Sequence, residues 1–385
     1  MEWFPLIQKE FLRFAKIFFN MALKCGIVGL PNVGKSTLFN CLSNAKAQSA
    51  NFPFCTIEPN VGTINVPDNR LYELEKLVNP ERVVFTTMEI VDIAGLVKGA
   101  SRGEGLGNQF LANIRECDAI IHVLRCFDNG NIIHVDGSVN PMRDKEVIDI
   151  ELQLKDLEKI EKRIQALARI LKSGDKDAVA ANNLALAIKA HLEQGRNVRE
   201  MQIEENDIPY LKEFQLITAK PVLYLCNVDE ASVKEGNAYV EQVKEGVKNE
   251  QAQVLVIGAQ IEADITELET YEERKMFLDE LGLDEPGVNR LIRAAYSLLD
   301  LQTYFTAGQK EVRAWTFKRG WTAPQAAGVI HTDFEKGFIR AEVMKYDDFI
   351  EHGSEAKLKE LGKMKVEGKE YVVQDGDIMH FRFNV

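Results

Sequence analysis

One short run of the chain has residue types and spacing that can bind a string of phosphates. Residues 29–36, Gly-Leu-Pro-Asn-Val-Gly-Lys-Ser, match G-x-x-x-x-G-K-[ST] between an apolar run and a helical one. Glycines let backbone N–H groups turn toward phosphate oxygens, and the N-terminus of the following helix adds its positive dipole end. We therefore expect Lys35 to reach the β- and γ-phosphates of a nucleoside triphosphate and the Ser36 hydroxyl to bind Mg²⁺.

An acidic residue further along the chain fits the same chemistry. Asp92-Ile93-Ala94-Gly95 comes at the end of the β-rich run 87–91. The pattern D-x-x-G is weak alone, but downstream of a phosphate-binding loop it predicts a second element of the site. We expect Asp92 to hold Mg²⁺, usually through water, and the Gly95 N–H to sense the γ-phosphate. The glycine-rich stretch 95–107 then predicts a mobile switch.

A threonine between these two motifs is a further candidate metal ligand. Thr56 lies in the run Asn-Phe-Pro-Phe-Cys-Thr-Ile, residues 51–57. A switch-loop threonine that closes on Mg²⁺ only when the γ-phosphate is present would occupy this place. The alternative is an ordinary surface threonine.

The residues expected beside the nucleotide base depart from the usual pattern. GTPases commonly carry N-K-x-D after this strand, whereas residues 227–230 read Asn-Val-Asp-Glu. Val228 replaces the lysine that covers the base, and Glu230 is one methylene longer than the aspartate that accepts two guanine hydrogen bonds. Because fixed bidentate geometry carries discrimination, this change weakens guanine selectivity and makes adenine a candidate base. Gly258-Ala259-Gln260 could add backbone contacts to the base.

The residue that would orient the attacking water is also unusual. Many GTPases place a glutamine directly after D-x-x-G, but this chain has Leu96, whose apolar side chain cannot orient water by hydrogen bonding. His134, in the loop after the apolar run 119–124, is the candidate replacement, and a structural role for it remains an equal alternative. His122 lies inside that run and is predicted to be a packed residue. We expect slow intrinsic turnover that a partner increases.

The elements that must position these residues follow from the apolar pattern. Short apolar runs alternate with helical segments, which predicts an α/β fold with a mostly parallel sheet and helices on both faces. A helix is expected from Lys35 to about Leu42. The expected strands are 25–28, 61–66, 87–91, 119–124, 221–226 and 254–257.

A polar helical segment interrupts this alternation between about residues 144 and 194. Apolar residues recur there at helical spacing, Gly174 punctuates the pattern, and a second helix is expected from Ala178 to Leu192. The length and the many charges favour a coiled-coil-like α-helical hairpin that protrudes from the nucleotide domain; the alternative is an ordinary buried helix.

The last part of the chain changes character. A helical segment, 265–301, is followed by β-rich pieces at 312–317, 338–344, 371–373 and 379–383, which predict a small α+β domain. From Leu301 onward Lys and Arg number 13 and Asp and Glu number 13, whereas the rest has 34 and 46. The neutral end is therefore the part expected to approach an anionic partner.

Composition limits the class of protein. With 385 residues, 45% hydrophobic and 28% charged, the chain is expected to form two or three globular domains, and its net charge of −12 argues against a nucleic-acid coating protein. Six cysteines without a CxxC pair predict reduced, buried thiols in a cytoplasmic protein. No stretch is long and apolar enough to span a bilayer. Residues 1–20 are expected to be a dispensable extension; the alternative is an amphipathic membrane or partner helix.

Taken together, the motifs above and the ending Asp-Gly-Asp-Ile-Met-His-Phe-Arg-Phe-Asn-Val (375–385) resemble the YchF (Obg-like ATPase) family over residues 21–385. The resemblance implies an OBG-type P-loop domain at 21–300 with the hairpin inserted at about 144–194. It also implies a β-grasp (TGS) domain at 301–384. The resemblance further implies a protein that hydrolyses ATP in preference to GTP and associates with ribosomes.

The resemblance also assigns residues. The nucleotide-binding run falls on Asn32, Val33, Gly34, Lys35, Ser36 and Thr37, the Mg²⁺ ligands on Ser36 and Thr56, and the base-side contact on Asn227 and Val228. Asn32 is where related proteins coordinate an activating K⁺. We expect ATP as substrate with GTP weaker, and the ribosome, its large subunit and ribosomal RNA as partners. We further expect a monomer with no membrane partner.

Three functions compete at this point: a ribosome-associated ATPase switch, a GTPase that assembles ribosomal subunits, and a nucleotide-regulated protein adaptor. Affinities for ATP and GTP separate the first two. Co-sedimentation with ribosomes, with and without the residues after Leu301, separates the third.

Overall fold

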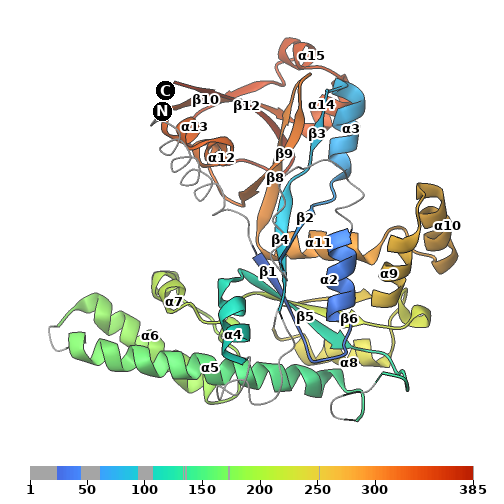
Figure 1. The fold of residues 1–385 in the computed structure, drawn as a ribbon. Coiled ribbons are helices and arrows are strands. Elements are labelled where there is room, and N and C mark those ends of the chain that lie inside the picture. The colour runs from blue at the N-terminus through green and yellow to red at the C-terminus, as the bar shows by residue number, and fades with distance from the viewer. Residues whose placement is uncertain are drawn as a thin grey trace, which may run out of the picture. The chain divides into compact units, whose positions relative to one another are not determined.

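The chain folds into two compact units (Figure 1). The computed structural model describes residues 24–44, 61–93, 107–132, 134, 137–171, 174–250 and 252–384. The first unit contains the described residues up to Ile64 and from Met88 to Val288, and the second contains Asn65–Thr87 and the described residues from Asn289 on. The first 20 residues, Thr56 and Gly95 lie outside the described residues.

The first unit is built on a six-stranded sheet in the order β2-β4-β1-β5-β6-β7. Strand β1 pairs in parallel with β4 and β5, and β5, β6 and β7 continue the parallel ladder. Strand β5 is buried along its whole length, as expected for a central parallel strand. The predicted strands are confirmed, with bounds Lys24–Val28 (β1), Val61–Asn65 (β2), Thr87–Asp92 (β4), Ala119–Arg125 (β5), Val222–Asn227 (β6) and Gln253–Ile257 (β7).

Helices connect these strands. Helix α2 contacts β1 and α9, and α8 contacts β7. The segment predicted as one helical stretch from 265 to 301 is divided among three helices, because Thr270 caps the start of α10 and Gly282 ends it in a left-handed conformation. The bounds are Lys35–Asn44 (α2), Gly107–Glu116 (α4), Ala238–Val247 (α8), Ala259–Glu267 (α9), Tyr271–Leu281 (α10) and Gly287–Leu298 (α11). Helices α10 and α11 follow the last strand of this sheet, and from Asn289 on α11 belongs to the second unit.

The predicted helical hairpin is present. Helix α5 (Pro141–Ile170) begins at the cap Asn140, and α6 (Lys176–Leu192) begins at the cap Asp175. Figure 1 shows the two helices side by side as a long pair that extends away from the sheet of the first unit. Its core includes Ile160, Leu167, Leu184 and Ile188, together with residues of the short segment that follows. That segment contains the 3₁₀ turns Val198–Glu200 (η5) and Glu205–Asp207 (η6) and helix α7 (Ile208–Phe214).

The second unit has its own six-stranded sheet in the order β11-β10-β12-β8-β9-β3. The pairs β10–β11, β10–β12 and β8–β9 are antiparallel, whereas β12–β8 and β3–β9 are parallel. This mixed sheet agrees with the predicted β-grasp module. Its strands are Val83–Val84 (β3), Leu301–Ala307 (β8), Val312–Lys318 (β9), Phe338–Lys345 (β10), Lys365–Glu367 (β11) and Asp377–Phe383 (β12).

Two hydrophobic clusters stabilise this sheet. One includes Tyr304, Phe317 and Met379 with helix α12, and the other includes Phe305 and Ile378 with α3, α14 and α15. The successive residues Tyr304 and Phe305 of β8 thus face opposite clusters, as the two-residue period of a strand requires. The helices are Asn69–Val78 (α3), Ala323–Ile330 (α12), Thr332–Lys336 (α13), Tyr346–His352 (α14) and Glu355–Glu360 (α15).

The composition of the second unit differs from the predicted domain, because a segment from the first part of the chain belongs to it. Leu71 and Leu74 of α3 are fully buried in the cluster that contains Phe305, and β3 adds an edge strand beside β9. Strand β8 was not predicted. The predicted strand 371–373 is wrong, because Val372 makes only an isolated bridge with Thr322.

The five cysteines among the described residues are buried and form no disulfide, as predicted. Burial raises the pKa of the Cys41 thiol to about 12, so this thiol is unreactive at neutral pH. Within the described ranges, no helix combines the length and the apolar character needed to cross a membrane.

Candidate nucleotide-binding site

The predicted phosphate-binding loop lies between β1 and α2. Strand β1 ends at Val28 and helix α2 begins at Lys35, so the intervening backbone turns at the helix N-terminus. Gly34 has φ +97°, and a Cβ there would lie 2.4 Å from Nδ2 of Asn227. A side chain at this position is excluded both by backbone strain and by the close approach of a second segment.

Lys35 is held in this loop with little access to water. The residue is 8% exposed, and within the described part of the chain its Nζ makes one long hydrogen bond, 3.4 Å, to the Leu30 carbonyl. Burial lowers the pKa of Lys35, and the nearby Asp92 carboxylate offsets part of that effect. A buried ammonium with one weak neutral acceptor is strongly attracted to an anion that enters the loop.

Asp92 ends strand β4 next to the same loop. It is in register with Ile27 on β1, and its Oδ1 is buried with no described group donating a hydrogen bond to it. Burial raises the pKa of Asp92, whereas Lys35 and the hydroxyl of Ser36 act in the opposite direction. A buried carboxylate oxygen without a donor, beside a hydroxyl, is a ligand set that suits Mg²⁺. These residues therefore fit the predicted metal site.

Asn227 links the loop to the far strands of the sheet. Its Nδ2 donates to the Val33 carbonyl at 2.9 Å, and its Oδ1 accepts from the Ala259 N–H at 2.9 Å. The residue is 3% exposed. Both ends of the amide are therefore engaged within the protein, and Asn227 fixes the phosphate-binding loop against the N-terminus of α9. The Ala259 N–H, which the sequence offered as a base contact, is used in this link.

The rest of the predicted base-side segment divides into buried and exposed residues. Val228 is 4% exposed, and its N–H donates to the Ile257 carbonyl at 2.9 Å. The Asp229 side chain accepts from the Ser232 N–H at 3.0 Å and caps the 3₁₀ turn η7 (Glu230–Ser232). Glu230 is exposed. Asp229 is exposed as well, but its carboxylate is engaged in this cap.

Arg125 organises the loop after β5, which the sequence did not reveal. The residue is 2% exposed, and its guanidinium donates to the carbonyls of Phe127, Asn129 and Ile132 at 3.0–3.2 Å. It also lies over the Phe127 ring, 4.6 Å from the centroid. An arginine at the end of a strand that is otherwise apolar except for His122 was the signal, because such a charge must find polar partners when it is buried. Arg125 is in register with Asn227, so this loop starts beside the site.

His134 is placed in that loop and is held by the hairpin. Its Nε2 lies 2.8 Å from Oδ2 of Asp144 in α5, and the two side chains are 6% and 2% exposed. This is the arrangement of a structural histidine, the alternative that the sequence left open.

His122 is a packed residue, as predicted. It is 3% exposed, lies 5.6 Å from the Tyr224 ring, and burial lowers its pKa to about 4. Close by is a set of paired charges at the root of the hairpin, which we call the hairpin-root network: Lys145, Asp149, Arg199, Tyr224 and Glu250.

The structure brings together most of the predicted site residues that it describes. The run from Asn32 to Thr37 lies at the carboxyl end of β1, and Asp92 and Asn227 end strands of the same sheet. In open α/β sheets, ligands bind at this edge, where the strand order reverses. Asn32 is exposed with φ +62°. Thr56, Gly95 and Leu96 lie outside the described residues.

The fold and the site define a P-loop nucleotide-binding protein with a hairpin insertion and a separate mixed-sheet unit. The family model MMR_HSR1, described as a 50S ribosome-binding GTPase, matches residues 24–179. The model YchF-GTPase_C, described as a protein of unknown function (DUF933), matches residues 301–384. Curated relatives named ribosome-binding ATPase YchF are similar over nearly the whole chain. The relative from Haemophilus ducreyi is 57% identical over 365 residues, 95% of this chain and 100% of the relative.

The chain belongs to the YchF family. The relative from Bacillus subtilis, also named ribosome-binding ATPase YchF, is 54% identical over 367 residues, 95% of this chain and 100% of its own length. The solved structure of the Schizosaccharomyces pombe YchF GTPase has a TM-score of 0.84 and 37% identity, and covers 94% of this chain and 98% of that one. The resemblance drawn from the motifs is thereby confirmed.

Proposed function

We propose that this chain binds and hydrolyses ATP with Mg²⁺ and acts as a nucleotide-linked factor on the ribosome. The observation that carries the proposal is the pair of under-coordinated buried groups at the carboxyl edge of the sheet. Among the described residues, the Lys35 ammonium has one weak acceptor and Asp92 Oδ1 has no donor. A triphosphate with its magnesium ion supplies the missing charge of each sign. The names of the curated relatives support the ribosome as partner.

In this proposal each residue of the site has a role. Backbone N–H groups from Asn32 to Thr37 hold phosphate oxygens, and Lys35 neutralises charge on the β- and γ-phosphates. Ser36, Asp92 and Thr56 would hold Mg²⁺, which supplies charge neutralisation at the transferred phosphoryl group when bound. The Gly95 N–H senses the γ-phosphate.

Adenine is the proposed base. Glu230 stands where a GTPase has the aspartate that binds guanine, and its side chain is one methylene longer. It is exposed, and the neighbouring Val228, which replaces the lysine that covers the base, is buried. Calorimetry with ATP and GTP at equal Mg²⁺ tests this, and we expect ATP to bind more tightly. A hundredfold preference for GTP would instead support the second candidate, a GTPase that acts in ribosome assembly. The S. pombe structure and the MMR_HSR1 family model are both described as GTPases, which supports this second candidate.

Hydrolysis without a glutamine after the D-x-x-G motif is proposed to be slow until a partner acts. A direct role for His134 requires its pair with Asp144 to open. His134→Ala separates the two roles: a catalytic residue lowers turnover at unchanged stability, whereas a structural one lowers the melting temperature. An activating K⁺ at Asn32 would show as faster turnover in KCl than in NaCl at equal ionic strength.

The partner is proposed to be the large ribosomal subunit through its RNA, with the chain acting as a cytoplasmic monomer. Arg313 stacks on Trp315 at 3.9 Å in the second unit, a pairing that suits contact with bases. Phe317, two residues further along β9, is 1% exposed and belongs to the core. Co-sedimentation with separated subunits, with and without the residues after Leu301, tests this assignment. Loss of the large-subunit signal on truncation is the expected result.

A further inference from the structure

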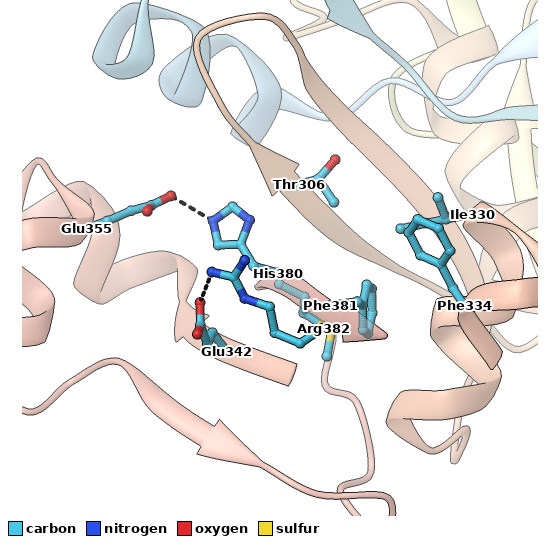
Figure 2. A pocket seen from close by; sticks show the side chains of 9 residues that line it. Thr306, Ile330, Phe334, Glu342, Glu355, His380, Phe381 and Arg382 are labelled. Atoms are coloured by element: carbon cyan, nitrogen blue, oxygen red, sulfur yellow. Dashed lines mark hydrogen bonds and ion pairs between the residues drawn. The ribbon is translucent and has the colours of Figure 1, made fainter. Parts of the chain in front are cut away.

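A pocket of about 290 Å³ opens in the second unit between β8 and β12 (Figure 2). The strands are parallel and in register at Ile378 and Phe305. Strand β12 continues to Phe383 beside β10, whereas β8 ends at Ala307, so the sheet opens beyond this pair. The lining comes from both strands and from the elements around them: Thr306, Ile330, Phe334, Glu342, Glu355, Met379, His380, Phe381 and Arg382.

One side of the pocket is flat and apolar. Figure 2 shows Ile330 and Phe334 on this side, with Phe381 beside them. Phe381 meets the Tyr304 ring edge-on at 5.7 Å, which holds it in place. Phe334 stacks on Phe383 at 3.7 Å between centroids. Fixed aromatic rings of this kind are stacking surfaces for another planar group.

The opposite side carries two carboxylates and two basic side chains. Oε1 of Glu355 lies 2.7 Å from Nε2 of His380, and Oε2 of Glu342 accepts from Arg382 at 3.1 Å. The hydrogen bond from His380 lowers the pKa of Glu355, so this carboxylate is ionised at neutral pH. An ionised carboxylate has about four lone-pair sites, so each keeps acceptor capacity for a ligand.

The rim of the pocket is basic. Arg382 and Arg340 both approach Glu342, and their side chains are 60% and 54% exposed. Since an arginine fork binds phosphate oxygens bidentately, this rim suits a ligand that carries phosphate.

We propose that this pocket binds an unstacked guanine base with its phosphate at the basic rim, as part of a single-stranded RNA. The volume is near the lower limit of roughly 300 Å³ for ligand pockets, so a base-sized group fits better than a whole cofactor. Guanine presents N1–H and an amino group on one edge, and a carboxylate accepts from both. Adenine presents the N1 lone pair there, which a carboxylate repels. Stacking, edge recognition and phosphate binding thus have separate residues in one pocket.

This inference goes beyond the nucleotide-binding site, because no pocket residue belongs to the phosphate-binding loop. The test uses the full chain with Mg²⁺ and excess ADP, which keeps that loop filled. Fluorescence anisotropy compares uridine-flanked RNA heptamers with guanine, inosine or adenine at the centre. Inosine keeps N1–H but lacks the amino group. We expect the guanine heptamer to bind about tenfold more tightly than either of the others.

Variants assign the preference to the pocket. Glu355→Gln combined with Glu342→Gln should abolish the preference for guanine while the folded spectrum persists. Arg382→Ala should weaken all three heptamers alike. The matched control Arg82→Ala also removes an exposed arginine paired with one glutamate in the second unit, and it should change nothing. Lys35→Ala should leave the preference intact, so failure at the nucleotide site is distinguishable.

Competition identifies the source of the base. Guanosine monophosphate that displaces the guanine heptamer only at much higher concentration supports RNA; equal potency would assign the same pocket to a free guanine nucleotide and overturn RNA as the source. The proposal is overturned if the unaltered chain shows no preference for guanine, or if the double glutamine variant keeps that preference. Displacement by an arginine-containing peptide but not by guanosine monophosphate would assign the pocket to a protein partner and also overturn it.

Discussion

Buried charges occupy two regions of the first unit, and the two regions satisfy them differently. In the hairpin-root network, Lys145 lies 2.7 Å from Asp149 and 2.6 Å from Glu250, and Arg199 contacts the same two carboxylates. At the phosphate-binding loop, the described residues give Lys35 one long hydrogen bond to a neutral acceptor and give Asp92 Oδ1 no donor. In the first region every charged side chain has a partner of opposite sign, and we call this a closed network, although Nη1 of Arg199 has no described acceptor. The second region is incomplete without a ligand.

This difference separates stability from function. A closed buried network is strongly destabilised when one partner is removed, because the remaining charge stays buried without compensation. In an incomplete site the buried charges are uncompensated in the free protein, so they already lower its free energy of unfolding. These charges gain their partners when the ligand binds. Strand β6 joins the two, since it carries Tyr224 of the hairpin-root network and Asn227 of the loop.

The largest effect on stability is expected from Arg199→Met. It leaves Asp149 and Glu250 with one cation between them, so the free energy of unfolding should fall by roughly 3–5 kcal/mol. Urea denaturation followed by circular dichroism measures this. Arg163→Met, which breaks the partly exposed pair with Glu213, should cost less than about 1 kcal/mol. Equal losses for the two variants would remove the distinction between the closed network and an ordinary ion pair.

Lys35→Ala should lower activity without lowering stability, in contrast to Arg199→Met. Removal of this charge should lower ATP turnover by about 10²–10³-fold, since the ammonium stabilises charge on the transferred phosphoryl group. Stability should be unchanged or higher, because a buried cation with a lowered pKa is removed. Steady-state phosphate release and thermal melting check both parts. Lys244→Ala, an exposed lysine paired with Glu241, serves as the control. A marked loss of stability in Lys35→Ala would show that this site too is a structural network.

The pKa of His122 makes the hairpin-root region sensitive to acid. Burial holds its pKa near 4, against about 6.5 in the unfolded chain, and Lys145 and Arg199 act in the same direction while Asp149 and Glu250 oppose it. As the pH falls from 6.5 to 4, the unfolded state takes up a proton that the folded state does not. Stability should therefore fall with decreasing pH by up to about 3 kcal/mol from this residue. His122→Gln should lack this component, so parallel curves for the two proteins would contradict the assignment.

Asn227 tests the link between the two regions. Asn227→Ala leaves the Val33 carbonyl and the Ala259 N–H without their partner, at a cost of about 1–3 kcal/mol for buried groups. We expect weaker ATP binding by calorimetry and an unchanged hairpin-root network. Asn227→Asp keeps the acceptor for Ala259 but sets a buried carboxylate against the Val33 carbonyl and beside the phosphate-binding loop, so it should bind ATP no better than Asn227→Ala. An affinity equal to that of the unaltered chain in both variants would show that the link is dispensable.

The smallest effect is expected on the exposed face of the hairpin. Lys162 pairs with Glu158 at 2.6 Å, but their side chains are 73% and 45% exposed. Lys162→Ala should change the free energy of unfolding by less than about 0.5 kcal/mol, because water competes for both charges. Denaturation curves that superimpose within error are the expected result. A loss comparable to that of Arg199→Met would mean that burial does not decide the strength of these pairs.

Local patterns in the sequence were sufficient for the first unit. The run from Asn32 to Thr37, the aspartate that ends β4 and the apolar strand β5 are each recognisable without a partner, because phosphate binding and parallel pairing impose fixed residue types at fixed spacing. The hairpin followed from helical periodicity. Arg125 was missed although a charge at the end of an apolar strand was visible, since its partners are backbone carbonyls of its own loop and no side-chain pattern identifies them.

The second unit was less predictable because its elements are recognisable only from contacts between segments that are distant in the sequence. Strand β3 has two residues, and residues 88–288 of the first unit separate β3 and helix α3 from the rest of the second unit in sequence. Its Leu71 and Leu74 look like any helical stripe until the cluster that contains Phe305 is known. The pocket beside β12 depends on where β8 ends, which strand propensity does not define.

The sequence by itself determined that this protein holds a phosphate chain, because the glycines, Lys35 and Ser36 act through neighbouring backbone whose geometry the motif dictates. Only the tertiary structure decided which charges are satisfied. Whether a buried lysine is paired, as Lys145 is, or left open, as Lys35 is, depends on residues brought together from distant segments. Burial and partner are properties of the folded chain, and they separate a structural charge from one that awaits a ligand.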